Sequence, residues 1–374
     1  MQEDGHATYV VGDVHGHLDE LLASLADAGL IDAEASWSGA DTHLWFLGDF
    51  VDRGPDGIGV IDLVMRLAAE AEEAGGHVQA LLGNHEILLL GMHRYGNTEV
   101  PSDFGPRSFA RSWEMNGGQH TDQEALTDEH IEWLSDRPAL ALVGEHLLMH
   151  SDTVEYLVWG TGIDEINAGI RQVLRSEDIV GWWEVWRRLT TRHAFRGPHG
   201  GEVAAQLLGV LGGDQVVHGH SVIADQLGVA PAQIETPYEY ADGRALGVDG
   251  GVFVGGPCLV VQLPFSDKPD DELPEDIVEL DPETGIYRDS DTDTDTDAEP
   301  DLGAEPEVEA EAEAEPEPEA AADAEAELEP EAAADAEPEV EPEPQSEPDA
   351  KAEDSPSAEE STDSTGEEDR QADT

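Results

Sequence analysis

Three short blocks of the sequence combine glycine with acidic, imidazole or amide side chains: GDVHG at 12–16, GDFVDRG at 48–54 and GNHE at 83–86. The groups that could bind metal or transfer protons in these blocks are Asp13, His15, Asp49, Asp52, Asn84 and His85. Oxygen and nitrogen ligands of this kind suit manganese, iron or zinc. Two such cations about 3.5–4 Å apart can activate a bridging water and clamp the oxygens of a phosphate ester. The blocks therefore predict a binuclear metal site for phosphate-ester cleavage.

Each block follows a short apolar run that we interpret as a buried β-strand. Runs at 8–11, 43–47 and 78–82 end at the glycine that opens a block, and apolar residues at helical spacing follow each block. Strand, polar loop and helix thus recur three times, which is the pattern of parallel βαβ units. Because ligands bind beyond the carboxyl ends of parallel strands, we expect the three loops to converge on one spot.

Beyond the third block, the pattern changes to an inserted helical segment and then to consecutive strands. Residues 92–137 are interpreted as the insertion, and helices are predicted over 164–189 and 201–211. Further strands are expected at 139–143, 146–149, 215–217, 223–227, 245–248 and 257–263. This order predicts an α/β fold in which two sheets pack face to face with helices outside.

Two later histidines stand at strand ends and could complete the set of ligands. His150 follows the strand at 146–149, and His220 lies in HGHS at 218–221, directly after another strand. His218 competes with His220 because residues two apart on a strand share a face. We prefer His220 because it lies closer to the loop.

The second and third blocks also contain groups that could act on the substrate. His85 follows the amide ligand of its block, so it would face the substrate, and Asp52 could orient its ring as the partner of a general acid. Arg53 adjoins Asp52 and could hold two phosphate oxygens. For a second arginine we prefer Arg196 in FRGPHG, with Arg192 as the alternative.

Composition divides the chain near residue 264. Residues 1–264 carry 41 acidic and 13 basic side chains, a net charge of −28, whereas the remaining 110 carry 45 and 4, a net charge of −41. The second part alternates Glu, Ala and Pro and cannot bury enough apolar surface to offset the entropy of folding. We therefore predict a catalytic domain over 1–264, a linker over 265–289 and a disordered acidic tail over 290–374.

Charge and cysteine content exclude several classes of protein. The negative balance would repel nucleic-acid phosphates and anionic lipids, so we expect no nucleic acid and no membrane among the partners. The single cysteine, Cys258, permits no intramolecular disulfide and lies in an apolar run, so we expect an inert core thiol. The sequence shows no signal peptide and no apolar window of membrane-span length, which predicts a cytoplasmic location. The oligomeric state is left open.

Taken together, the blocks resemble those of the calcineurin-like metallophosphoesterases. The VDRG continuation of the second block is similar to the phosphoprotein phosphatase branch, as are WEMNGGQHT at 113–121 and HIEWL at 130–134. Within that branch, bacterial serine/threonine protein phosphatases and symmetrical diadenosine tetraphosphate hydrolases are the most similar. The resemblance covers roughly residues 8–263 and implies a β-sandwich of two mixed sheets flanked by helices.

The resemblance also implies a role for each site residue. One divalent metal would be bound by Asp13, His15 and Asp49. The other would be bound by Asp49, Asn84, His150 and His220, with manganese preferred over iron or zinc. His85 with Asp52 would protonate the leaving group, while Arg53 and Arg196 would grip phosphate. One departure is that Ser151 and Asp152 follow His150 where the family usually has small residues.

Three functions are compatible with these residues. The first is hydrolysis of phosphoserine or phosphothreonine in proteins by metal-bound hydroxide. The second is hydrolysis of dinucleoside polyphosphates, such as diadenosine tetraphosphate, or of another small phosphate ester at the same site. The third, a non-catalytic phosphate-binding scaffold, predicts a lost ligand or a lost His85, and neither is lost.

Overall fold

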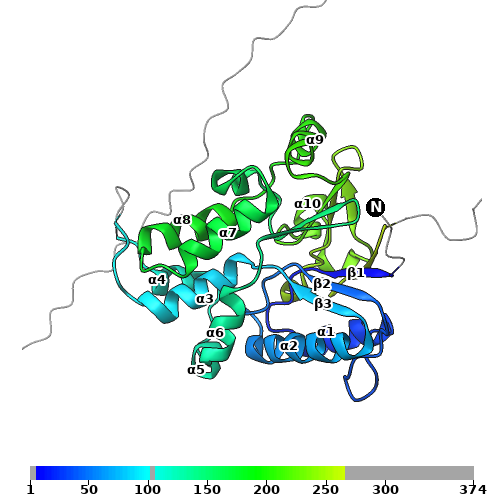
Figure 1. The fold of residues 1–374 in the computed structure, drawn as a ribbon, viewed down its shortest axis with the longest axis horizontal. Helices are drawn as coiled ribbons and strands as arrows, with labels where there is room; N and C mark the ends of the chain where they lie inside the picture. Colours follow the sequence, from blue (N-terminus) through cyan, green and yellow to red (C-terminus); the bar gives the residue numbers. More distant parts are fainter. Residues whose placement is uncertain (1–5, 102–105, 266–374) are drawn as a thin grey trace, which may run out of the picture. The chain divides into compact units, whose positions relative to one another are not determined.

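The computed structural model describes residues 6–101 and 106–265 (Figure 1). The predicted tail, and the predicted linker beyond Phe265, lie outside the described residues. The described part contains two mixed β-sheets flanked by helices, which confirms the predicted fold class. Within it, none of the helices combines the length and the apolar character needed to cross a membrane.

The first sheet carries the three sequence blocks. Its strand order is β3-β2-β1-β9, formed by β1 (Thr8–Val11), β2 (His43–Phe46), β3 (His77–Ala80) and β9 (Val260–Leu263). β1, β2 and β3 run parallel, and β9 pairs antiparallel with β1. Helices α1 (Leu18–Asp27) and α2 (Gly57–Ala74) connect the parallel strands and cover one face of this sheet in Figure 1. The predicted βαβ units are confirmed, so the three blocks follow strands that end at the same edge.

The second sheet has the strand order β4-β5-β6-β8-β7. Its strands are β4 (Leu140–Val143), β5 (His146–Met149), β6 (Gln215–His218), β7 (Tyr238–Tyr240) and β8 (Ala245–Gly247). β5, β6 and β8 are parallel, whereas β4 and β7 close the two edges antiparallel. The carboxyl ends of β5 and β6 lead to the two later histidines.

The two sheets pack against each other through an apolar layer. Val10 and Val261 from the first sheet share one buried cluster with Leu148, Val217 and Leu246 from the second. Residues that alternate with these point the other way, because successive side chains of a strand face opposite sides. Val11, for example, belongs to the larger cluster that includes the helices. The sheets thus form a sandwich whose outer faces are covered by helices.

Of the other helices in the described residues, four follow β3 before the second sheet begins, and three lie between β5 and β6. They are α3 (Asn84–Tyr95), α4 (Phe109–Met115), α5 (His120–Ala125), α6 (Asp128–Ser135), α7 (Ile163–Leu174), α8 (Ile179–Leu189) and α9 (Gly200–Leu211). The helical interpretation of 92–137 is confirmed by α4, α5 and α6. Single 3₁₀ turns occur at η1 (Glu155–Trp159), η2 (Pro231–Gln233) and η3 (Val252–Val254).

The elements differ from the sequence predictions in several details. The segment 223–227 is not a strand but the short helix α10 (Ile223–Leu227), which the left-handed Gly228 ends at φ +66°. The helical stretch expected over 164–189 contains two helices, and the Asp178 side chain caps the second of them by accepting from the Val180 N–H. Strand β7 was not predicted, and β9 begins only at Val260, so the buried Cys258 precedes it.

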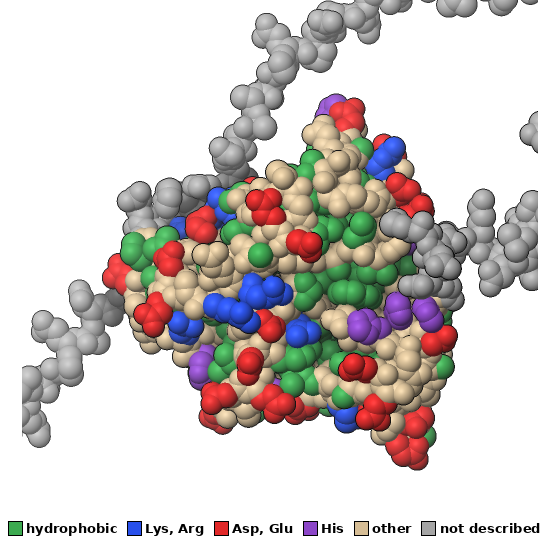
Figure 2. Space-filling view, viewed as in Figure 1, with side chains coloured by type: hydrophobic (Ala, Val, Ile, Leu, Met, Phe, Trp, Pro, Cys, Tyr) green, Lys and Arg blue, Asp and Glu red, His purple; other side chains and the backbone are tan. Residues whose placement is uncertain are grey.

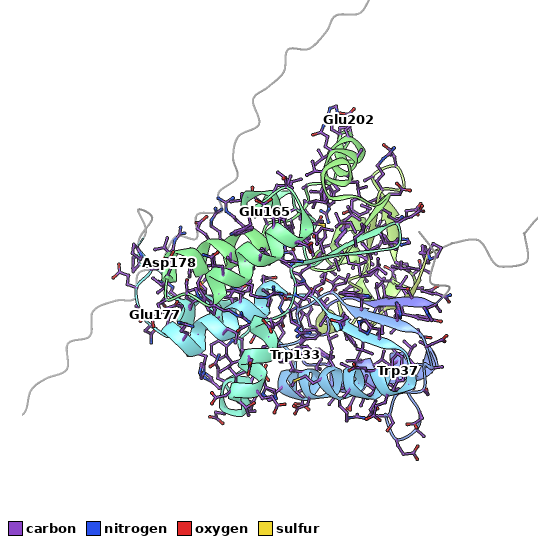
Figure 3. The ribbon with its side chains drawn as sticks, in the orientation of Figure 1. Trp37, Trp133, Glu165, Glu177, Asp178 and Glu202 are labelled. Carbon is purple, nitrogen blue, oxygen red and sulfur yellow. The ribbon has the colours of Figure 1, made fainter. Side chains whose placement is uncertain are left out.

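Acidic side chains occur both on the surface and, in smaller number, in the interior of the described residues. Acidic side chains are scattered over the face in Figure 2, and Figure 3 shows Glu165, Asp178 and Glu202 on the outer helical layer. A smaller set of carboxyl side chains is buried: Asp13, Asp49, Asp52, Glu86, Asp122, Asp152 and Asp249. Buried carboxylates require donors or cations. Asp13, Asp49, Asp52 and Glu86 belong to the three blocks, so buried acidic groups gather where the sequence predicts cations.

Candidate metal centre and active site

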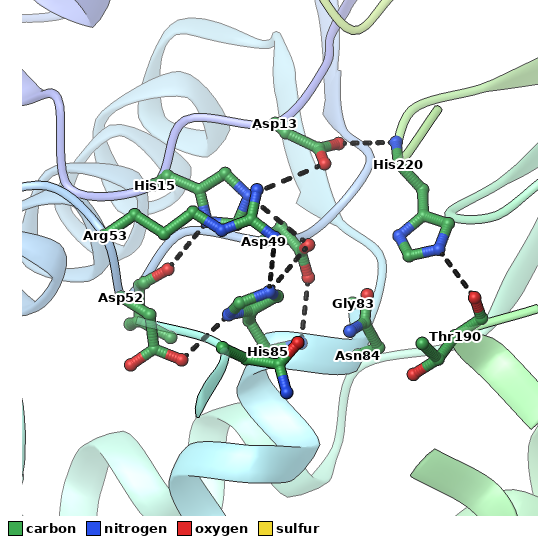
Figure 4. A network of polar contacts seen from close by, with 12 residues as sticks. Asp13, His15, Asp49, Asp52, Arg53, Gly83, Asn84, His85, Thr190 and His220 are labelled. Carbon is green, nitrogen blue, oxygen red and sulfur yellow. Dashed lines mark hydrogen bonds and ion pairs between the residues drawn. The ribbon is translucent and has the colours of Figure 1, made fainter. Parts of the chain in front are cut away.

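The loops after β1, β2 and β3 come close together, and Figure 4 shows Asp13, Asp49 and His85 from these loops at one place. The N–H groups of Val14 and His15 both donate to the Asp49 carbonyl, at 3.1 and 2.9 Å. At Gly48 the backbone has φ +99°, and an added Cβ would lie 2.5 Å from the Gly83 nitrogen. Glycine is therefore required where the second loop crosses the third. This close approach brings side chains from all three blocks to one place.

Three imidazoles at this place are each fixed by a backbone carbonyl. The contacts are His15 Nδ1 to Val51 O at 2.9 Å, His150 Nδ1 to Leu47 O at 3.0 Å and His220 Nε2 to Thr190 O at 3.0 Å. A carbonyl only accepts, so the nitrogen facing it carries the proton and the other nitrogen keeps its lone pair. Burial lowers the pKa of all three rings, which keeps them neutral. Each ring therefore presents one nitrogen suited to bind a metal.

Four residues form the first group of converging ligand atoms. Asp13, Asp49, His150 and His220 each offer an atom, and these atoms lie within 4.8 Å of one another. The Nε2 lone pair of His150 also faces the Asn84 Oδ1 at 2.9 Å and the Asp49 Oδ1 at 3.4 Å. Acceptors that face one another in a buried site need a positive charge between them. These residues fit a divalent cation.

A second group lies on the other side of Asp49. The Nε2 of His15 and the Oδ2 of Asp49 are 3.6 Å apart, and both are buried without a hydrogen-bond partner among the described residues. Asp13 Oδ2 lies 3.8 Å from the same nitrogen. Asp49 thus belongs to both groups, with Oδ1 toward His150 and Oδ2 toward His15. One carboxylate that faces two ligand sets is the arrangement that a pair of cations requires.

His85 also lies near the second group, but its nitrogens are engaged elsewhere. Its Nε2 is 4.0 Å from Asp49 Oδ2 and completes a cluster with His15 and Asp49. Its Nδ1 lies 2.8 Å from Asp52 Oδ2, and its Nε2 lies 3.1 Å from Arg53 Nη2. Since a carboxylate accepts and a guanidinium donates, Nδ1 carries the proton and Nε2 accepts. Both ring nitrogens of His85 thus have hydrogen-bond partners, and the ring lies beside the candidate metal ligands.

The inserted segment braces this histidine through Asp52. The Trp113 indole Nε1 donates to Asp52 Oδ1 at 2.8 Å, while Asp122 Oδ2 accepts from the Asp52 N–H at 3.1 Å. Gly117 O accepts from the Arg53 N–H at 2.8 Å. The residues of 92–137 therefore position the second block, a role that their sequence alone did not reveal.

Glu86 ties the second loop to the third. Its Oε2 accepts from the N–H groups of Asp49 and Gly83 at 2.8 and 2.9 Å, and its Oε1 accepts from the Phe50 N–H at 2.8 Å. Burial and then the neighbouring Asp49 charge raise the pKa of Glu86 to about 8. Burial also raises the pKa of Asp49, but positive charge on the surrounding imidazoles, that of His150 first, lowers it, and the net direction is well below its usual value. Asp49 is therefore the carboxylate that stays ionised.

The backbone at the site is strained. Left-handed φ values occur at His15 (47°), Asp49 (54°), Asp52 (65°), Arg53 (65°) and His220 (61°). Such a conformation costs a non-glycine residue about 1–3 kcal/mol and persists only where the surroundings enforce it. The loops are thus bent into place by tertiary contacts.

The two candidates for the second phosphate arginine lie in different surroundings. Arg196 lines a cavity of about 290 Å³ with Gln226, Tyr238 and Tyr240, and its Nε donates to Gln226 Oε1 at 3.2 Å. None of the converging ligand residues lines that cavity. Arg192 is exposed, and after burial and His150 its charge further lowers the pKa of His220. Arg196 therefore lines a cavity separate from the ligand groups, and Arg192 remains the alternative candidate.

Two other sequence questions concern the second sheet. His218 Nε2 contacts the Tyr240 hydroxyl at 2.7 Å and lies outside the ligand groups, which supports the preference for His220. Asp152 is buried and accepts from the Ser221 hydroxyl at 2.5 Å and the His193 N–H at 2.9 Å. Asp152, one of the two residues that depart from the family pattern, thus links the loop of His220 to the loop of Arg192 by hydrogen bonds.

Sequence reasoning missed Asp249. Its Oδ1 accepts from the Gly251 N–H at 2.9 Å, its Oδ2 is buried without a partner among the described residues, and burial raises its pKa to about 7. Asp249 follows the strand expected at 245–248 and precedes two glycines. This is the same strand-end pattern as in the three blocks, so a signal for it was present.

The calcineurin-like phosphoesterase family model matches residues 7–224. That match covers more than half of the chain, so the chain belongs to the calcineurin-like phosphoesterases. The resemblance drawn from the three blocks is confirmed. Members of this family use divalent metal ions, and the two groups of Asp and His side chains could bind them.

Curated relatives match shorter segments. The chain is 38% identical over 78 residues to Shewanella-like protein phosphatase 2 of Arabidopsis thaliana, which covers 21% of this chain and 20% of that protein. It is 38% identical over 97 residues to the symmetrical bis(5'-nucleosyl)-tetraphosphatase of Pectobacterium atrosepticum, which covers 26% and 30%. The matches thus span less than a third of these relatives.

Among solved structures, a cold-active protein tyrosine phosphatase is similar with a TM-score of 0.54. The two chains are 21% identical, and the match covers 69% of this chain and 73% of the other. A structure of the cold-active protein tyrosine phosphatase of a psychrophilic Shewanella species gives a TM-score of 0.52, with 21% identity over 69% of this chain and 75% of that one. These likenesses show that the fold is shared.

Proposed function

We propose that this chain is a binuclear metal-dependent phosphatase that hydrolyses phosphoserine and phosphothreonine monoesters in proteins. The observation that carries the proposal is the Asp49 carboxylate, whose two oxygens face two separate sets of lone pairs. The His85–Asp52 pair beside it adds the proton donor that an ester cleavage needs.

Two divalent cations, with manganese preferred, would supply an activated water and neutralise the charge of the phosphoryl oxygens. Asp13, His15 and Asp49 would hold one of them. The other would be held by Asp49, Asn84, His150 and His220. Asn84, the neutral ligand, lies beside His150 in the structure.

The other side chains would bind the phosphoryl group and move the proton. Arg53 and Arg192 would each donate to phosphoryl oxygens, because a guanidinium matches two oxygens in its plane. When the Arg53 Nη2 hydrogens are donated to phosphate instead of to His85, the His85 Nε2 would be free to carry a proton. From Nε2, His85 would give this proton to the departing oxygen while Asp52 holds Nδ1.

A second candidate substrate is a dinucleoside polyphosphate. It is favoured by the 97-residue match to a symmetrical bis(5'-nucleosyl)-tetraphosphatase, which is longer than the 78-residue match to the protein phosphatase. The same residues would act on it, since the two reactions differ in the leaving group and not in the phosphoryl chemistry.

The deciding experiment combines metal analysis with a substrate panel. The manganese-loaded full chain is assayed with phosphoserine and phosphothreonine peptides and with diadenosine tetraphosphate, and its metal content is measured. The control is His85→Asn, which should keep the metal and lose most of the turnover. Turnover of peptides alone supports the first candidate, and turnover of the dinucleotide alone supports the second. A chain that binds no metal, or that turns over neither substrate, contradicts the proposal.

A further inference from the structure

Phe253 contacts two residues of the site, although it belongs to none of the three blocks. The guanidinium carbon of Arg53 lies 4.1 Å from the centroid of the Phe253 ring. The His15 ring meets the same ring edge-on, with the centroids 5.1 Å apart and the planes at 79°. Since Arg53 Nη2 is 3.1 Å from His85 Nε2, the guanidinium lies between an aromatic face and the proposed acid.

The loop after β8 is built to present this ring. Phe253 is the middle residue of the turn η3, which is flanked by Gly251 at φ +76° and Gly255 at φ +87°. Both values lie in the left-handed region that glycine adopts at low cost. The ring packs against a buried apolar cluster that contains Val222 and Ile234. It therefore has a fixed position from which to support a neighbour.

The backbone of Arg53 is also held in place. Its N–H donates to Gly117 O at 2.8 Å, and its backbone is left-handed at φ +65°. A cation over an aromatic face is attracted by the ring quadrupole, and the attraction grows where water is excluded. With both ends held, the guanidinium would lose little freedom when it binds phosphate, which favours affinity.

We propose that Phe253 is a positioning residue that holds the Arg53 guanidinium for the phosphoryl oxygens. It acts through Arg53 and so sets the affinity for the phosphoryl group rather than the rate of bond cleavage. This inference rests on the proposed function, in which Arg53 binds phosphate. A merely structural Phe253 would instead affect folding or metal content, and it would do so whether or not Arg53 is present.

The test is a double-mutant cycle on the manganese-loaded full chain. Wild type, Phe253→Leu, Arg53→Ala and the double variant are compared by kcat and KM for p-nitrophenyl phosphate and by calorimetric binding of inorganic phosphate. We expect Phe253→Leu to raise KM and the phosphate dissociation constant about fivefold, with kcat within about twofold and metal content unchanged. In the Arg53→Ala background the same change should have no further effect. Phe253→Trp should retain wild-type affinity, because its face supports the same interaction.

Val254→Ala is the matched control, because Val254 is the exposed neighbour in the same turn. It should leave both constants unchanged. The inference is overturned if Phe253→Leu weakens phosphate equally with and without Arg53, or if its main effect is lost metal. An inactive wild type would refute the proposed function instead, and the calorimetric cycle with phosphate would still decide the role of Phe253.

Discussion

Replacing Asp52 by Asn tests how the site keeps the His85 proton in place. The Trp113 indole can only donate, so the amide must turn its oxygen toward Trp113 and its NH₂ group toward His85 Nδ1. His85 Nδ1 would then have to accept a hydrogen bond, so the ring proton would move to Nε2. In the unsubstituted chain Nε2 lies 3.1 Å from Arg53 Nη2, so two donors would face each other there. The substitution therefore reverses the tautomer and breaks the link to Arg53 while the shape of the side chain is conserved.

The expected loss follows from the size of general acid catalysis. Removing a positioned acid lowers rates by about 10²–10⁴-fold, or about 2.7–5.4 kcal/mol of transition-state stabilisation. We expect Asp52→Asn to show this loss in kcat on a phosphoserine peptide, whose alkoxide leaving group needs a proton. The loss on p-nitrophenyl phosphate should be much smaller, since nitrophenolate departs without one. Metal content should be unchanged.

The measurement is the kcat of the wild type and of Asp52→Asn on the phosphoserine peptide and on p-nitrophenyl phosphate, together with the metal content of each preparation. Trp113→Phe in the Asp52→Asn background frees the amide to present its oxygen to Nδ1, so this double variant should regain part of the activity. Equal losses on both leaving groups, or a fully active Asp52→Asn variant, would refute the acid role of the pair.

Other predictions concern the metals, the loops and the arginines. In the metal-free folded protein Asp249 and Glu86 hold protons up to pKa values of about 7 and about 8, which the unfolded chain releases at their ordinary values of 3.8 and 4.5. Above about pH 7 the buried histidines are neutral in both the folded and the unfolded chain, so stability without metal should fall as the pH rises to about 8, and manganese should raise Tm more at pH 8 than at pH 7. Thermal melts with manganese or chelator measure this, and an equal or opposite pH trend would contradict it. Gly48→Ala should lower the unfolding free energy in urea by about 1–3 kcal/mol more than Gly75→Ala, because both positions are left-handed but only Gly48 is crowded. Similar losses at the two glycines would argue against the close loop crossing. Arg192→Ala should raise the phosphate inhibition constant about tenfold or more, whereas Arg196→Ala should change it less than about twofold. The reverse order would restore Arg196 as the phosphate ligand.

Local patterns in the sequence were sufficient for the first sheet and for most of the site. The alternation of apolar runs, glycine–acid turns and helical spacing depends on neighbouring residues, so it identified β1, β2 and β3 and the loops after them. The residue types in those loops then indicated oxygen and nitrogen ligands. At 223–227 the local signals were mixed, and the interpretation as a strand was wrong. The segment begins and ends with an apolar residue, Ile223 and Leu227, and a short helix capped by glycine can have these residues just as a strand can.

The tertiary structure decided what depends on contacts between distant parts of the chain. The carbonyls of Val51, Leu47 and Thr190 choose which imidazole nitrogen is free, and no pattern in the sequence links them to their histidines. The same holds for Phe253 over Arg53, because packing of separate loops sets this distance. Sequence thus determined which chemical groups are available, and folding decided their protonation, orientation and partners, since those are set by neighbours that only the packed chain provides.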